Sequence, residues 1–254
     1  KLFKNIVDYE LINFNWIRFI YFKSHGGLLN ILGLNYHHPD SSACLVKDGK
    51  LLAAVDEERF KRIKHYSGFP INSINYCLEN QNLKISEIDY VALNYSPSSN
   101  LSGKIKYSLK NIFKKTTFNK ILNLRNKVKH KNDLKLFLKK NNFKGKIINV
   151  EHHTSHLASS YFLSNFDSCL GLTIDGFGDF SSMESFECNG RSINSINKVL
   201  FPHSLGIFYQ ATTQFLGFKN YGDEYKVMGL ASYGNPKFEK EFSEILSFSN
   251  KDYF

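Results

Sequence analysis

Two segments of the chain carry side chains that could hold a metal ion beside an anionic ligand. The first, Glu151-His152-His153-Thr154-Ser155-His156, offers two imidazoles four residues apart. The second, residues 173–179, places Asp175 in a glycine-rich run after an apolar stretch. Imidazole nitrogens and a carboxylate oxygen suit a divalent transition metal, and a glycine loop at a strand end can hold a phosphate through its backbone N–H groups. Together the two segments predict an enzyme that handles a phosphate-bearing ligand beside a metal.

The spacing within each segment indicates which side chains could act together. On a helix, His152 and His156 would share a face with their Cβ atoms about 5–6 Å apart, whereas His153, about 100° round the helix, would face elsewhere. Paired structural or surface histidines are the alternative. In the second segment, a tight turn whose Asp175 and Asp179 side chains accept bonds from backbone N–H groups is the alternative to a ligand site. The position of Asp175 at the end of an apolar strand favours function.

A third candidate lies in the loop at residues 36–42, which contains His37 and His38. Its hydroxyl and backbone N–H groups could cradle a phosphate or a carbonyl, and a histidine there could act as a general base near neutral pH. An ordinary capped turn is the alternative. Residues 202–206 and 222–229 are two further polar segments with glycine, to which spacing alone assigns no role.

The composition is that of a globular domain with one unusual segment. The chain has 254 residues, 42% hydrophobic and 22% charged, with a formal net charge of +10. Residues 102–146 hold fifteen Lys or Arg and one acid, Asp133, so the basicity belongs to this segment. We expect amphipathic helices with a solvated basic face there, with an anionic partner as the alternative, and we expect no nucleic-acid partner. Four scattered cysteines without a C-x-x-C pair and no apolar run approaching a membrane span predict a cytoplasmic protein without a membrane segment.

Apolar runs and turn signals predict an α/β or α+β domain. Residues 1–28 are interpreted as a non-native or upstream-translated extension. An Asp48-Gly49 turn predicts the first of two hairpins. The expected elements are strands at 31–35, 42–46, 51–55, 88–94, 146–150 and 169–174, a helix at 70–80, one or two helices in 102–146, and a hairpin over 182–187 and 194–200.

Taken in order, these segments resemble the O-carbamoyltransferase family of antibiotic and nodulation-factor biosynthesis. The matching stretches are residues 30–35, 40–45, 57–65, 68–70, 151–156, 175–176, 201–206 and 224–230. As an ordered set they are far more specific than any one motif. The resemblance covers residues 30–237 except the basic insertion.

The resemblance implies an actin-like (ASKHA, ribonuclease H-type) α/β fold, with residues 29–254 as an incomplete Kae1-like domain and 102–146 as a basic helical insertion. In this family a YrdC-like domain joins ATP and carbamoyl phosphate into carbamoyl adenylate, and the Kae1-like domain moves the carbamoyl group to an acceptor hydroxyl. We expect three further parts beyond Phe254 in the same polypeptide. These are the remaining half of the Kae1-like domain, a fourth metal ligand, and the YrdC-like domain with its Mg²⁺. The fragment alone is expected to be inactive. The expected partner is a small-molecule acceptor such as a sugar or secondary metabolite, and a homodimer stays open.

The resemblance also implies roles for individual residues. His152, His156 and Asp175 would hold an iron-type divalent metal that contacts the carbamoyl adenylate. A histidine before Asp40 would activate the acceptor hydroxyl; Pro39 interrupts the simplest pattern, and we favour His38 over His37. The remaining positions that line the carbamoyl-adenylate pocket, together with Asp175, are Lys64, Ser204 and Gly206.

Two other functions fit parts of the same pattern. An actin-like small-molecule kinase would share the glycine loop and use Mg²⁺ without the histidine pair. A non-catalytic nucleotide-binding or partner-binding module would use the basic insertion as its docking surface.

Overall fold

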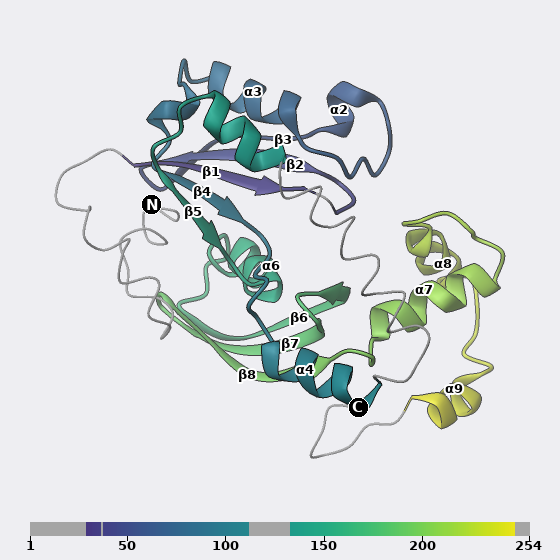
Figure 1. Ribbon diagram of the computed structural model, residues 1–254. Helices are drawn as coiled ribbons and strands as arrows, with labels where there is room; N and C mark the ends of the chain where they lie inside the picture. The colour runs from purple at the N-terminus through teal and green to yellow at the C-terminus, as the bar shows by residue number, and fades with distance from the viewer. Residues whose placement is uncertain (1–28, 37, 112–132, 247–254) are drawn as a thin grey trace.

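The computed structural model describes residues 29–36, 38–111 and 133–246, which form two β-sheets with helices between and around them (Figure 1). The first sheet contains β1 (Asn30–Asn35), β2 (Ser42–Lys47), β3 (Lys50–Asp56), β4 (Tyr90–Leu93) and β5 (Lys146–Asn149). The second contains β6 (Ser168–Gly178), β7 (Ser181–Asn189) and β8 (Ser192–Leu200). The helices are α2 (Glu58–Lys61), α3 (Ile71–Glu79), α4 (Leu101–Lys110), α6 (His152–Tyr161), α7 (Leu205–Phe215), α8 (Glu224–Ala231) and α9 (Glu239–Ile245), with a short 3₁₀ turn at Ile85–Glu87 and helical residues at 133–140.

The first sheet has the strand order β3-β2-β1-β4-β5. The strands β1, β2 and β3 form an antiparallel meander, and β4 and β5 add to β1 in parallel. This is the arrangement of a ribonuclease H-type domain, so the predicted actin-like α/β fold is confirmed. The predicted hairpin is also confirmed, because Asp48 and Gly49 both have positive φ, at 50° and 73°. Two successive residues in this region form the turn whose twist matches that of the flanking strands.

The main core lies on one face of this sheet. Alternate strand residues such as Leu32 and Leu34 are buried there, as expected for a sheet covered on that face. The helices α3 and 133–140 cover it, contributing Ile74, Cys77, Leu134 and Leu138. In contrast, α4 leaves Ile105 and Leu109 more than half exposed. Of the helices predicted in the basic stretch, the one at residues 133–140 therefore packs into the core and α4 does not.

Helix α6 lies between the two sheets (Figure 1). Leu157 and Tyr161 on one side of α6 pack against Phe186 and Cys188 of the second sheet. Its opposite side faces the first sheet across a cavity of about 580 Å³. The helix therefore brings residues 152–156 to the space between the sheets.

Three features differ from the sequence predictions or lie beyond the described residues. The predicted strand at 169–174 continues to Gly178, which keeps Asp175 inside β6. Helices α7, α8 and α9 were not predicted. The extension at 1–28, His37, the centre of the basic insertion at 112–132 and residues 247–254 lie outside the described residues. Among the described helices, none combines the length and apolar character needed to cross a membrane.

Candidate metal centre

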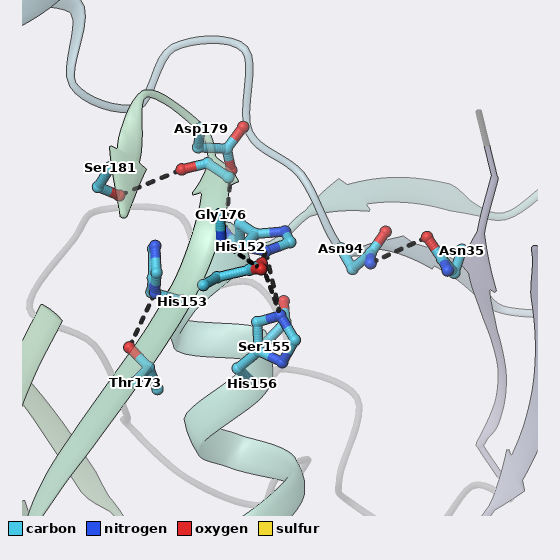
Figure 2. Close-up of polar contacts among 12 residues, drawn as sticks. Asn35, Asn94, His152, His153, Ser155, His156, Thr173, Gly176, Asp179 and Ser181 are labelled. Atoms are coloured by element: carbon cyan, nitrogen blue, oxygen red, sulfur yellow. Dashed lines mark hydrogen bonds and ion pairs between the residues drawn. The ribbon is translucent and has the colours of Figure 1, made fainter. Parts of the chain in front are cut away.

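Three side chains converge at the junction of α6 and β6. His152 Nε2 lies 2.7 Å from Asp175 Oδ2 and 3.0 Å from His156 Nε2, and His156 Nε2 lies 3.5 Å from the same oxygen. Figure 2 shows the two imidazoles meeting at this point. Ligand atoms that each lie about 2.1 Å from one ion are roughly 3 Å apart. The donor set and its spacing therefore fit a single divalent transition metal.

Local structure places the two imidazoles on one face. Glu151 caps α6, because its Oε2 accepts a bond of 2.8 Å from the backbone N–H of Thr154. The helix thus begins at His152, and His156 follows one turn later on the same face. His153 points elsewhere, as predicted: it is fully buried and its Nδ1 bonds to Thr173 Oγ1 at 2.8 Å.

The glycine-rich end of β6 is shaped around these ligands. Asp175 Oδ1 accepts a bond of 2.6 Å from the backbone N–H of Gly176, which orients the carboxylate. Gly178 lies directly under the His152 ring, where a Cβ atom would overlap ring carbons Cδ2 and Cγ. Glycine at 178 is therefore required for the His152 imidazole to reach Asp175.

A second carboxylate, Asp179, anchors the helix that carries the histidines. Its Oδ2 accepts bonds from the backbone N–H of His152 at 2.9 Å and of Ser96 at 2.7 Å. Asp179 itself has a positive φ of 48°, a conformation that aspartate tolerates better than most residues. Both aspartates thus accept bonds from backbone N–H groups, as the alternative interpretation expected, but Asp175 also turns its second oxygen, Oδ2, to the histidines.

The chain matches a known protein family over most of its length. The model of the family described as Carbamoyltransferase N-terminus matches residues 30–253. The chain belongs to this family. An uncharacterized protein of Synechocystis sp. is 37% identical over 230 residues, covering 83% of this chain and 36% of that protein. Nodulation protein NolNO of Sinorhizobium fredii is 34% identical over 230 residues, covering 87% of this chain and 31% of that protein. The chain thus spans about a third of the length of these curated relatives.

A solved structure is also similar at a low level. YeaZ from Pseudomonas aeruginosa has a TM-score of 0.36 and 10% sequence identity, covering 68% of this chain and 67% of that one. A similarity this low supports no conclusion about the function of the chain.

The structure brings two further predicted residues of this carbamoyltransferase N-terminal region against Asp175. The Ser204 hydroxyl donates to the carbonyl oxygens of Gly176 at 2.7 Å and Asp175 at 3.3 Å, and it accepts from Ile207 N–H as the cap of α7. A Cβ atom on Gly206 would lie 2.6 Å from the Asp175 carbonyl oxygen. Ser204 therefore holds the end of β6 through hydrogen bonds, and the missing side chain of Gly206 lets the start of α7 approach it.

The remaining predicted residues lie in loops around the centre. The His38 ring centroid is 6.3 Å from that of His152, so the loop of the predicted base lies beside this candidate ligand. His37 lies outside the described residues. Lys64 is exposed in the loop after α2, and no contact among the described residues joins it to the three ligands.

The cavity beside the ligands gives a small molecule access to them. Its walls include His152 and His156, and Figure 2 shows Asn94 and Asn35, also in its walls, bonded to each other at 3.2 Å. A volume of about 580 Å³ lies in the range of small-molecule sites.

Electrostatics favour a charged carboxylate between the imidazoles. Hydrogen bonds from His152 and His156 hold the pKa of Asp175 far below its usual range, although burial opposes this. Burial lowers the pKa of His152, but the hydrogen bond and charge of Asp175 outweigh it and the pKa is raised. Burial raises the pKa of Asp179.

We expect metal affinity to rise with pH through the raised pKa of His152. A metal binds the neutral imidazole and must displace its proton, whereas Asp175 stays ionised far into acid. Titrating the full-length protein with Co²⁺ should give a dissociation constant at least about tenfold larger at pH 6 than at pH 8. An unchanged constant would show that the imidazoles are not ligands.

Proposed function

We propose that the full-length protein transfers a carbamoyl group from carbamoyl adenylate to a hydroxyl of a small-molecule acceptor. The observation that carries the proposal is the convergence of His152, His156 and Asp175 on one point, with His38 beside them and a cavity at their side. Membership of the Carbamoyltransferase N-terminus family supports the reaction class. Two relatives are named nodulation proteins, which agrees with the resemblance to the family of antibiotic and nodulation-factor biosynthesis from which we propose the acceptor class.

The three ligands would hold a divalent metal, for which we propose Fe²⁺. Such an ion would supply positive charge to the carbamoyl oxygen while negative charge develops on it. Asp175 would contribute the charged ligand; its backbone is held by hydrogen bonds from Ser204, and Gly206 leaves room for this contact. Asp179 fixes the backbone at His152.

In the transfer step, His38 would take the proton of the acceptor hydroxyl. The acceptor oxygen forms its bond to the carbamoyl carbon as the bond from that carbon to the adenylate phosphate oxygen breaks, and AMP leaves. His38 lies close enough to the His152 ring for a substrate held at the metal to reach both. Lys64 is proposed to contact the adenylate from the loop after α2.

The donor would be made elsewhere in the same polypeptide. The described chain spans about a third of its relatives, which leaves room for a YrdC-like domain that uses ATP, Mg²⁺ and carbamoyl phosphate. The second half of the Kae1-like domain would supply the fourth metal ligand.

The experiment uses the full-length protein with Fe²⁺, ATP, carbamoyl phosphate and a panel of hydroxylated acceptors under anaerobic conditions. Mass spectrometry should detect acceptors that gain one carbamoyl group, and this product should require both ATP and carbamoyl phosphate. A double variant, His152→Ala with His156→Ala, should lose bound iron and the product together. Transfer of a phosphoryl group from ATP to the acceptor would contradict the proposal and indicate a kinase.

A further inference from the structure

A histidine–aspartate pair lies outside the three metal ligands, in loops that approach them. His65 Nδ1 lies 3.0 Å from Asp40 Oδ1, and the two side chains are 40% and 53% exposed. An ion pair this exposed adds little to global stability. The contact can still fix how the two loops lie relative to each other.

The pair joins two loops at their outer ends. Ser41, the residue after Asp40, makes two bonds to the loop of His65. Its backbone N–H donates to the Tyr66 carbonyl at 2.8 Å, and its hydroxyl donates to the Gly68 carbonyl at 2.7 Å. Asp40 and His65 both have positive φ, at 64° and 54°. Such backbone conformations cost energy in residues other than glycine and persist where contacts hold them.

A third loop closes over the pair from the far side. The Tyr221 ring meets the His65 ring edge to face, with centroids 5.2 Å apart. Gly222, with a φ of +80°, lets this loop approach, since a Cβ there would lie 3.1 Å from Cε1 and Nε2 of His65. Burial raises the pKa of Tyr221, and the charges of Asp40, Asp175 and Glu224 raise it further. The third loop therefore packs directly on the His65 ring.

The loop that the pair restrains also carries His38. Asp40 follows His38 by two residues, and its carbonyl accepts a bond of 2.9 Å from Asn35 Nδ2 at the end of β1. The backbone at Asp40 is thus held by β1 on one side, while its side chain is held by His65 on the other. While both restraints are present, they keep His38 close to His152.

We propose that His65 is a positioning residue, which with Asp40 and Tyr221 latches the loop of His38 beside the metal centre. This inference rests on the proposed carbamoyl transfer for its kinetic test. The latch acts through the Nδ1–H bond to Asp40 and needs no chemistry from Nε2.

The chain offers matched variants that separate the two nitrogens of His65. In His65→Asn the amide nitrogen is attached to Cγ, as Nδ1 is, and can still donate to Asp40. In His65→Gln the amide nitrogen lies one carbon further out, near the position of Nε2. His65→Ala removes both.

In the full-length protein we expect His65→Ala and His65→Gln to lower kcat about tenfold or more, with iron content and the KM for carbamoyl phosphate unchanged. His65→Asn should recover most of the loss, to within about threefold of the starting kcat. Equal rates in all four proteins would overturn the latch. A His65→Asn rate as low as that of His65→Ala would also overturn it and assign proton transfer to Nε2.

Hydrogen–deuterium exchange tests the same latch without any turnover. Peptides covering residues 38–42 and 218–223 should exchange faster in His65→Ala and remain protected in His65→Asn. Unchanged exchange in His65→Ala would contradict the latch. If the unaltered full-length protein transfers no carbamoyl group, the proposed function fails, while the exchange result still decides the latch.

Discussion

Asp175→Asn in the full-length protein should abolish carbamoyl transfer and weaken metal binding by more than about 100-fold. In the unaltered protein, Asp175 Oδ2 lies 2.7 Å from His152 Nε2 and 3.5 Å from His156 Nε2. The low pKa of Asp175 keeps that oxygen charged at every working pH. An amide of the same shape keeps the volume but loses the charge, and its N–H₂ group would face two imidazole nitrogens if it turned inward.

Metal content by mass spectrometry and turnover by product formation measure the two effects. Circular dichroism should stay close to that of the unaltered protein, because the amide keeps the volume of the Asp175 side chain within β6. Asp167→Asn is the matched control, since this exposed aspartate precedes β6 and its side chain makes no described contact with the ligands. Normal turnover in Asp175→Asn would refute the site assignment.

Gly178→Ala should disrupt the same centre without touching a donor atom. The added methyl group would occupy the space of the His152 ring, so the imidazole must rotate away from Asp175 or the end of β6 must move. Either response separates the donors, and we expect metal affinity to fall by more than about tenfold. Overpacking at such a contact should also lower the free energy of unfolding by about 1–3 kcal/mol.

Metal titration and thermal unfolding of the full-length variant would measure these changes. Gly229→Ala is the control: a methyl group in that position of α8 meets open space. Because alanine is the better helix former, it should leave metal affinity unchanged and stability equal or slightly higher. Unaltered metal affinity in Gly178→Ala would mean that His152 binds the ion from a different rotamer.

Local sequence patterns predicted most elements of the first sheet. The Asp48-Gly49 turn set the register of β2 and β3, and the apolar spacing after Pro70 located α3. Helices α7, α8 and α9 escaped prediction. Their exposed faces still carry large apolar residues such as Phe215, Met228 and Ile245, so no clear division into a buried and a polar face marked them.

The candidate metal centre was likewise predicted only in part from the sequence. The sequence by itself determined His152 and His156, because a four-residue spacing places both on one face of a single helix. It also determined Asp175 as a candidate, because a carboxylate ended an apolar run.

Only the tertiary structure decided how these groups meet and what holds them. Asp179 anchors α6, Ser204 bonds to the Asp175 and Gly176 carbonyls, and His65 reaches Asp40 from a different loop. Each of these contacts joins residues more than twenty positions apart in the chain. Periodicity reports only which residues share a face within one element, whereas contacts between elements depend on packing distances and left-handed backbone turns that no local spacing encodes.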